Sequence, residues 1–168
     1  LPGKKIPSYT LIYWDGDGNQ MEHYDPYAYP MQFTEQEQKQ FENGICYSIY
    51  EKLGAHPVKI DGVSGVYFAV WAPNAIRVSV VGNFNNWDGR AYQMNLLESG
   101  IYELFIPGVR AGDIYKYEIK AKGGLTYLKS DPYANAAQLR PNNASVVVDL
   151  GKYAWQDENW MKKRGVTQ

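Results

Sequence analysis

Hydrophobic and polar side chains alternate along the second half of the chain, as is typical of β-strands that bury one face. The alternating segments are separated by Gly, Pro and Asn at intervals of roughly 8–12 residues. They are residues 66–71, 76–81, 102–106, 115–120 and 145–149. Short strands at this spacing indicate an all-β fold, an antiparallel β-sandwich, rather than strands that alternate with helices.

One short helix is predicted upstream of these strands, at residues 35–42. Thr34 and Glu37 have the spacing of a capping box, in which each side chain accepts a hydrogen bond from the other residue's backbone N–H. Gly44 stands where a helix commonly ends with a residue in the left-handed conformation. Phe41 is the one apolar side chain of the segment, so we expect a connecting helix rather than a core element.

A tetrapeptide near the start of the chain, Asp-Pro-Tyr-Ala at 25–28, recurs 106 positions later at 131–134. At the same ungapped offset Gly18 matches Gly124, and each copy follows an aromatic, alternating segment and a Gly turn. We therefore expect residues 1–30 to be the end of an earlier sandwich module. The alternative is a hairpin motif that the two segments share without a common fold. A half-module exposes a sheet edge, so we expect it to dock on its neighbour, to pair with a second chain or to be mobile.

Length and composition restrict the possible partners. A chain of 168 residues that is 45% hydrophobic and 21% charged has room for one globular domain or slightly more. Its 17 basic side chains are balanced by 18 acidic ones, which argues against a nucleic-acid partner. No apolar run approaches the roughly 20 residues of a transmembrane helix, and no charged-then-apolar leader opens the sequence. We therefore expect no membrane partner and a cytoplasmic location.

The sequence offers no candidate for a metal site or a catalytic nucleophile. His23 and His56 lie far apart without companion ligands, and Cys46 is the single cysteine. The segment 15–19, Asp-Gly-Asp-Gly-Asn, resembles the start of a calcium-binding EF-hand loop, but Gln20 stands where that loop needs glycine. Because Gly and Asn tolerate positive φ, we interpret the segment as a hairpin turn. No cofactor is predicted.

The segment 83–90, Asn-Phe-Asn-Asn-Trp-Asp-Gly-Arg, carries the first candidate chemistry. It places Trp87 among polar turn residues, where the flat face of an indole can lie against the apolar face of a sugar ring. The amides of neighbouring asparagines such as Asn85 both donate and accept hydrogen bonds, which matches paired sugar hydroxyls. Alternatively Phe84 and Trp87, or Phe84 alone, fold back to close the end of the sandwich. Lys116 is a second candidate because its strand's alternation turns it away from the core, although a strand lysine is often only solvated.

Several longer motifs closely resemble those of bacterial 1,4-α-glucan (glycogen) branching enzymes. They follow one another in the same order over roughly residues 23–150. The motifs are Tyr-Glu-Lys-Leu-Gly-Ala-His-Pro at 50–57, Phe-Ala-Val-Trp-Ala-Pro-Asn-Ala at 68–75, Val-Ser-Val-Val-Gly at 78–82 with the loop 83–90, Ser-Gly-Ile-Tyr-Glu-Leu-Phe-Ile-Pro-Gly at 99–108, Tyr-Lys-Tyr-Glu at 115–118 and Lys-Ser-Asp-Pro-Tyr-Ala at 129–134. The resemblance implies a carbohydrate-binding module of family 48, which is an immunoglobulin-like β-sandwich that precedes the catalytic barrel of these enzymes.

The resemblance also implies a division of the chain. Residues 1–46 would be the remnant of a preceding β-sandwich module with its helical connector, residues 47–151 the family 48 module, and residues 152–168 a linker toward a catalytic barrel. A second helical turn is expected at 157–164. The enzymes of this family transfer α-1,4-glucan segments to form α-1,6 branches, using carboxylates on a (β/α)₈ barrel of about 250 residues. The chain cannot contain that barrel, so we expect no catalytic residue and no enzymatic activity in it.

Two site residues follow from the resemblance directly. In glycogen-binding relatives of the module, the tryptophan of the Phe-Asn-x-Trp loop stacks on glucose, and here that residue is Trp87. The lysine of the Tyr-Lys strand contacts sugar hydroxyls in those relatives, and Lys116 matches it.

The resemblance implies further sugar contacts, but the matching positions in this chain are ambiguous or carry a different residue. An asparagine before the last strand matches Asn142 or Asn143, with Leu139 as its apolar neighbour. Where the relatives carry a second tryptophan, three residues before Asp-Pro, this chain has Leu128, with Tyr127 beside it. The loss of one aromatic platform implies weaker binding, or a module used mainly for packing.

The expected function is therefore non-catalytic binding of α-glucan by the N-terminal region of a glycogen branching enzyme. The implied partners are glycogen, amylopectin and malto-oligosaccharides, together with the enzyme's own catalytic barrel. One alternative is a structural spacer that packs on that barrel, for which a buried Trp87 is expected. Another is a glycogen-sensing regulatory module.

Overall fold

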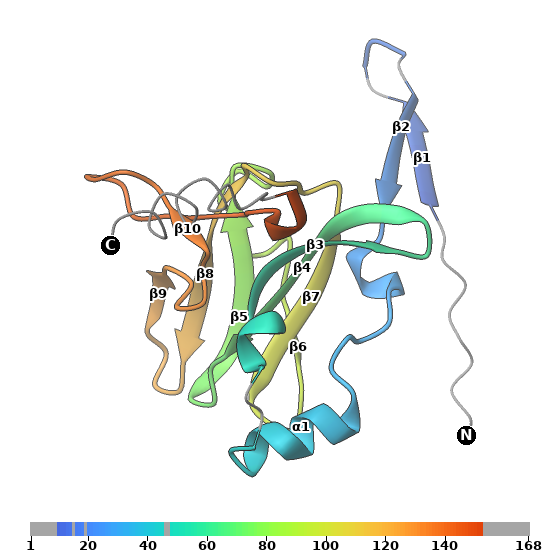
Figure 1. The fold of residues 1–168 in the computed structure, drawn as a ribbon. Helices are drawn as coiled ribbons and strands as arrows, with labels where there is room; N and C mark the ends of the chain where they lie inside the picture. The colour runs from blue at the N-terminus through green and yellow to red at the C-terminus, as the bar shows by residue number, and fades with distance from the viewer. Residues whose placement is uncertain (1–9, 15, 19, 46–47, 153–168) are drawn as a thin grey trace, which may run out of the picture.

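The computed structural model describes residues 10–14, 16–18, 20–45 and 48–152, and two antiparallel sheets form its centre (Figure 1). One sheet has four strands in the order β3–β4–β7–β6; the other has five, in the order β10–β11–β8–β5, with β9 also paired to β8. The strands are β3 (Gly54–Ile60), β4 (Val63–Trp71), β5 (Ala75–Gly82), β6 (Asn95–Leu96), β7 (Ile101–Pro107), β8 (Ile114–Ala121), β9 (Thr126–Lys129), β10 (Ala136–Ala137) and β11 (Ser145–Val146). The predicted all-β, immunoglobulin-like sandwich is confirmed.

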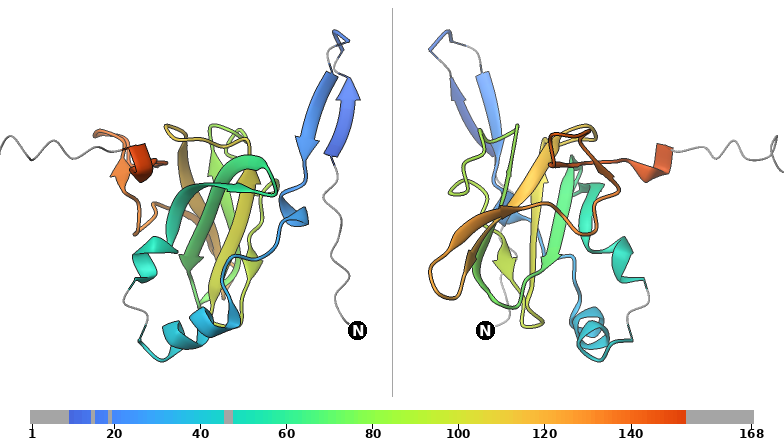
Figure 2. Two further views of the ribbon diagram at one scale, coloured as in Figure 1. Left: turned by 45° about the vertical axis from the view of Figure 1, so that its right-hand side comes forward. Right: turned by 90° about the vertical axis from the view of Figure 1, so that its left-hand side faces the viewer.

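The remaining elements lie mainly before the sandwich in the sequence. They are β1 (Thr10–Trp14), β2 (Gln20–Tyr24), η1 (Pro26–Ala28), α1 (Glu35–Glu42), η2 (Ile49–Glu51) and, at the end, η3 (Leu150–Lys152). Strands β1 and β2 form a separate hairpin that projects beyond the two sheets (Figures 1 and 2).

Alternating side chains of the facing strands fill the space between the sheets. Val66 and Phe68 of β4 are fully buried there, and Tyr115 and Tyr117 of β8 face them from the other sheet. The rings of Phe68 and Tyr115 meet edge to face with their centroids 5.0 Å apart. The period-two pattern of the sequence therefore marks the strand faces that form this core.

A second hydrophobic cluster lies on the outer face of the four-stranded sheet. Tyr67 and Phe105 point away from the space between the sheets, yet both are buried. The chain that precedes β3 covers them, and its residues Phe33 and Leu53 are almost completely buried in this cluster. The upstream segment is thus packed on the sandwich as a further layer.

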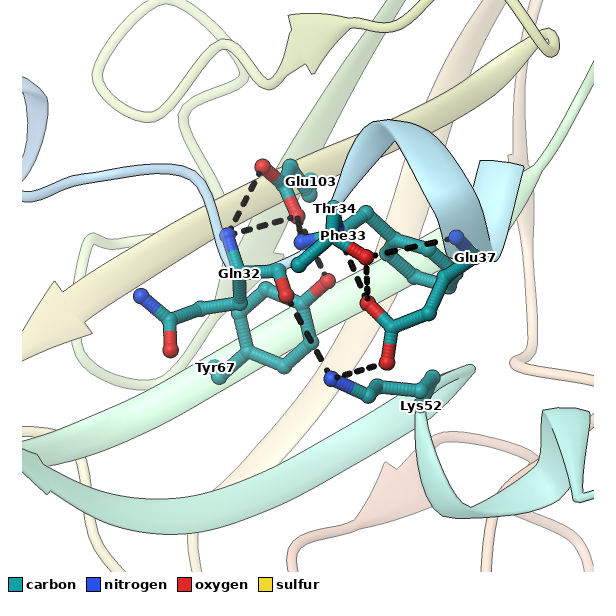
Figure 3. A network of polar contacts seen from close by, with 7 residues as sticks. All are labelled: Gln32, Phe33, Thr34, Glu37, Lys52, Tyr67 and Glu103. Carbon is teal, nitrogen blue, oxygen red and sulfur yellow. Dashed lines mark hydrogen bonds and ion pairs between the residues drawn. The ribbon is translucent and has the colours of Figure 1, made fainter. Parts of the chain in front are cut away.

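A buried glutamate on β7 anchors this upstream segment (Figure 3). Glu103, which is only 2% exposed, accepts the hydroxyl hydrogen of Tyr67 at 2.6 Å. It also accepts the backbone N–H groups of Gln32 at 3.1 Å and Phe33 at 3.2 Å. Lys52 in turn donates to the carbonyl of Gln32 at 3.3 Å. Burial raises the pKa of Glu103, whereas these hydrogen bonds act in the opposite direction.

Helix α1 starts and ends where the sequence predicts. The Thr34 hydroxyl accepts the N–H of Glu37 at 3.2 Å, and the Glu37 carboxylate accepts the N–H of Thr34 at 2.8 Å. This is the predicted capping box, and Gly44 follows the helix with φ +69°. None of the helical residues is buried, although Phe41 packs against the second hydrophobic cluster. The helix is therefore the polar connector that the sequence predicts.

The two hairpins of the predicted repeat have the same register. Leu11 pairs with His23 in β1–β2, and Tyr117 pairs with Lys129 in β8–β9, which is the same pair displaced by 106 positions. Four consecutive pairs agree in this way, so the repeat covers backbone pairing as well as sequence.

Both copies of Asp-Pro-Tyr-Ala also form the same turn. The carboxylate of Asp25 accepts the N–H of Tyr27 at 2.9 Å, and that of Asp131 accepts the N–H of Tyr133 at 2.8 Å. The structure thus shows a repeated unit of hairpin and turn. The complete earlier module inferred from it stays a prediction.

Four strands of the sandwich, β3, β6, β9 and β10, lie outside the alternating segments that the sequence predicts, and the last predicted strand is shorter than expected. Strand β3 is not predicted because Pro57 interrupts its pattern, but β3 is an edge strand, where the missing N–H of a proline is tolerated. The last strand ends at Val146 rather than at residue 149. The N–H of Val147 still bonds to the carbonyl of Asp113 at 2.9 Å, but the N–H of Asp113 bonds to the carbonyl of Arg110 at 3.1 Å, so the regular pairing with β8 stops there. The turn expected at 157–164 lies outside the described residues, and the predicted boundaries at 46/47 and 151/152 stay predictions.

Replacing Glu103 by glutamine tests the anchoring carboxylate. Because burial raises its pKa, Glu103 contributes most to stability below the ordinary glutamate pKa, and this contribution falls as the pH rises through the raised pKa. The free energy of unfolding of the wild type minus that of Glu103→Gln should therefore decrease as the pH rises from about 4 to about 8. Urea unfolding at a series of pH values measures it, with Glu98→Gln at an exposed position as the control. An increase with pH would contradict this account, because the hydrogen bonds to the carboxylate would then outweigh its burial.

Candidate functional site

The loop that follows β5, residues 83–90, folds over the outer face of the five-stranded sheet. Val81 of β5 points toward this face and is fully buried. Gly89 lies directly against the carboxylate of Glu118 on β8, so that a Cβ atom at this position would come within 2.2 Å of Oε1. Arg77 holds the same carboxylate in an ion pair of 2.7 Å. Only glycine lets the loop approach the sheet so closely without displacing this pair.

The side chain of Asn85 closes the loop on itself. Its Oδ1 accepts the N–H of Gly82 at 2.9 Å, and its Nδ2 donates to the carbonyls of Val80 at 2.9 Å and Asp88 at 3.3 Å. Both ends of the amide are therefore occupied by the protein backbone. Asn85 therefore shapes the loop, and its predicted contact with sugar stays a prediction.

The closed loop holds Trp87 in an uncommon backbone conformation. Asn86 and Trp87 have φ values of +53° and +59°, which non-glycine residues seldom adopt. The N–H of Trp87 bonds to the carbonyl of Gly82 at 3.1 Å. The indole is 38% exposed, whereas Phe84 turns inward toward Phe68, with ring centroids 6.3 Å apart. Of the alternatives left open by the sequence, the structure shows the one in which Phe84 alone closes the sandwich end.

Lys116 and Asn143 meet on the same outer face of the five-stranded sheet. Lys116 lies opposite Val81 across β5 and β8, next to the base of the loop. Its Nζ donates a hydrogen bond to Oδ1 of Asn143, and the hydroxyl of Ser130 donates to the carbonyl of Asn143. Two of the predicted polar contacts are thus neighbours; Asn143 is exposed and Lys116 is half-buried.

Three further predicted residues lie at the margins of this face. Leu128 pairs with Glu118 across β8 and β9, so it shares the outer face, and it is 52% exposed. Leu139 and Asn142 lie in the loop between β10 and β11, where the N–H of Asn142 bonds to the carbonyl of Leu139 at 3.1 Å. Leu139 is 89% exposed. These side chains provide apolar and amide surface beside Asn143.

Tyr127 is the predicted site residue that the structure separates from the others. It pairs with Ile119, whose side chain lies in the core between the sheets, so Tyr127 faces the opposite side of β9 from Leu128. There it lines a cavity of about 330 Å³ together with Trp71 and Pro73. Tyr127 and Leu128 are neighbours in sequence, but they face opposite sides of β9 and cannot contact the same sugar ring.

A buried carboxylate that sequence reasoning did not single out supports the Asn143 side of this face. Asp131, 6% exposed, accepts hydroxyl hydrogens from Tyr115 at 2.6 Å and Tyr117 at 3.2 Å, and its own N–H bonds to Ser145 at 2.9 Å. Burial raises the pKa of Asp131 and of both tyrosines. The repeated Asp-Pro-Tyr-Ala motif was the signal that could have revealed it. The bonds fix both ends of the segment that carries Asn143.

The charged groups on the loop itself pair with each other. The Arg90 guanidinium lies 2.8 Å from the Asp88 carboxylate and holds the pKa of that carboxyl at about 2. An exposed pair of this kind contributes little to stability. Among the described residues, no three His, Cys, Asp or Glu side chains gather as a metal site requires. Within the same residues, no helix has the length and apolar character needed to cross a membrane.

The sequence of the sandwich matches a known protein family. Residues 52–134 match the family described as "Carbohydrate-binding module 48 (Isoamylase N-terminal domain)". These residues therefore form the part of the chain that belongs to this family. The match covers β3 to β9, and therefore includes the loop of Trp87 as well as Lys116 and Leu128.

The family 48 chain also has close relatives among curated proteins. It is 49% identical over 175 aligned residues to the 1,4-alpha-glucan branching enzyme GlgB of Synechococcus sp. (strain JA-3-3Ab), covering 99% of this chain and 23% of that protein. It is 48% identical over 165 residues to the same enzyme of Cellvibrio japonicus, covering 96% and 22%. The predicted resemblance to branching enzymes is confirmed, and the chain spans less than a quarter of these relatives' length.

A solved pullulanase from Bacillus acidopullulyticus also matches the family 48 chain. The sequences are 26% identical over 59% of this chain and 12% of that one, with a TM-score of 0.49.

Replacing Asn85 by alanine tests how the Trp87 loop is held. Three hydrogen bonds to backbone groups are lost, so we expect the free energy of unfolding to fall by about 1–3 kcal/mol. The exposed Asn86, whose positive φ glycine adopts readily, provides the control, and Asn86→Gly should change stability by less than about 0.5 kcal/mol. Urea unfolding measures both variants. Equal stability of Asn85→Ala and wild type would show that the amide does not hold the loop.

Proposed function

We propose that this family 48 module binds α-glucan on the outer face of its five-stranded sheet, with Trp87 as the central platform. The observation that carries the proposal is the contrast between two aromatic rings of one loop. Phe84 is packed inward, whereas Trp87 is kept partly exposed by a backbone that few side chains adopt. A loop that only closed the sandwich would gain by burying both rings.

The surroundings of the indole suit a glucose polymer. Its flat face can pack on the C–H groups of a sugar ring, while Lys116 and Asn143 lie on the same face and offer an ammonium and an amide to hydroxyl groups. Leu128 and Leu139 add apolar surface where a second sugar ring could lie. The platform at Leu128 lacks an aromatic ring, so we expect weak binding of short oligosaccharides.

The homology gives this binding a place in a larger reaction. We infer that the chain is a non-catalytic region of a glycogen branching enzyme that transfers α-1,4-glucan segments to form α-1,6 branches in glycogen. The catalytic carboxylates then belong to the part of the relatives that this chain does not span. Binding of glycogen or amylopectin here would keep the polymer close to that catalytic part, and such an enzyme would work in the cytoplasm.

A structural role is the second candidate, and a specific observation favours it. Leu128 and Leu139 are exposed apolar side chains beside the Trp87 surface, and they could pack on a catalytic domain. In that case glucan would not compete for the surface, and substitutions there would change the stability of the whole enzyme instead. A glycogen-sensing regulatory role would use the same binding surface.

Affinity electrophoresis in gels that contain glycogen tests the proposal. Wild-type chain should be retarded, and Trp87→Ala should weaken binding by about tenfold, which corresponds to about 1.4 kcal/mol. Trp14→Ala is the matched control, because Trp14 is 66% exposed on the β1–β2 hairpin and lies away from the site. If the wild type is not retarded, or if Trp87→Ala is retarded as strongly as wild type, glucan binding at this surface is wrong.

A further inference from the structure

A hollow opens at the edge of the sandwich, on the side of the five-stranded sheet opposite to the Trp87 surface. It lies between β9 and the turn that joins β4 to β5, and its volume is about 330 Å³. Binding sites for small ligands begin at about this size. Its walls include Trp71 and Pro73 on one side and Tyr127 on the other, and its polar groups are those of Asn74, Lys129 and Ser130.

Two of the aromatic residues that line this hollow are exposed to solvent, whereas the third, Tyr117, is buried. Trp71 is 53% exposed and Tyr127 is 41% exposed. Trp71 also lines a second cavity, of about 510 Å³, together with Leu53 and Tyr133. The indole therefore stands between two adjoining hollows, and tyrosine rings lie on both sides of it.

We propose that this edge is a second contact site for an α-glucan chain, with Trp71 between two sugar-binding hollows and Tyr127 as the outer wall of one of them. The arrangement suits a polymer whose successive units each present an apolar ring face and a hydroxyl edge. The indole and phenol rings match the ring faces, and the Ser130 hydroxyl and Asn74 amide match the hydroxyls.

The charge of the hollow is compatible with a neutral ligand that carries hydroxyl groups. Lys129 is the single charged side chain among the residues that line the 330 Å³ cavity, and it forms no ion pair with the described residues. An ammonium with free N–H groups can donate to hydroxyl oxygens without needing an opposite charge.

This site goes beyond the proposed function and does not depend on it. Tyr127 and Leu128 face opposite sides of β9, so one chain segment cannot contact both faces through them. A branched polymer can reach both surfaces with two of its chains, and the two contacts then add to its avidity. Short linear oligosaccharides would occupy the two surfaces separately.

Titration of the ¹⁵N-labelled chain with maltoheptaose, followed by NMR, tests the second site. It is performed in the Trp87→Ala variant, so that signals from the first surface are removed. We expect the indole N–H of Trp71, assigned from its loss in Trp71→Phe, and the amide signals of Tyr127 and Lys129 to shift in a saturable manner. Adding Tyr127→Ala should weaken this binding by about tenfold.

Leu125→Ala, at an exposed position in the β8–β9 turn, is the control and should leave the titration unchanged. No shift of the Trp71 indole, or equal affinity with and without Tyr127, overturns the second site; the edge would then be free for a protein partner. Shifts at Trp71 in a chain whose Trp87 surface does not bind would support this site while removing the proposed function. Retardation by glycogen that depends on Trp87, without shifts at Trp71, would support the proposed function and remove the second site.

Discussion

The amide of Asn85 is the contact on which the candidate site depends. It bonds to the backbone of Val80 and Gly82 at the end of β5 and to that of Asp88 in the loop, and in doing so it keeps Asn86 and Trp87 at positive φ. A positive φ costs of order 1 kcal/mol or more for each of these two residues. The three hydrogen bonds of Asn85, at about 1 kcal/mol each, can offset this cost. The result is a rigid turn in which one aromatic ring enters the core and the other stays at the surface. Gly89 completes the arrangement, because its missing side chain lets the loop rest on Glu118.

Two buried carboxylates hold irregular segments onto the sandwich in the same way. Glu103 binds a tyrosine hydroxyl and the backbone of the segment before α1, and Asp131 binds two tyrosine hydroxyls and the turn after β9. Burying a carboxylate costs desolvation energy, but the hydrogen bonds that it accepts from several donors fix the positions of those donors. Removal of Glu103 would take the acceptor from the buried Tyr67 hydroxyl, and removal of Asp131 would take it from the buried Tyr115 hydroxyl. These hydrogen bonds thereby fix connecting segments of the chain, including the one that carries Asn143.

The sequence predicts those features that depend on local periodicity or on adjacent residues. The alternating strands and the capping box of Thr34 are of this kind, and the structure confirms them. Strand β3 was not predicted because Pro57 is acceptable only in an edge strand. Whether a strand lies at an edge is a property of the whole sheet and cannot be read from the local sequence. Tyr127 was grouped with Leu128 because the resemblance aligns positions, whereas the side of a strand that a residue faces follows from its pairing partner. The role of Asn85 is not visible in sequence, since an asparagine that binds its own loop and one that binds a sugar occupy the same motif.

The most direct test of the account is a search for contacts between protons of the Trp87 indole ring and ring protons of maltoheptaose by intermolecular nuclear Overhauser effects. The account predicts such effects from the indole to the C–H groups on one face of a glucose unit, with Lys116 and Asn143 signals perturbed in the same sample. Binding of the oligosaccharide without any effect at this indole would contradict it, because the exposed ring would then have no part in recognising the sugar.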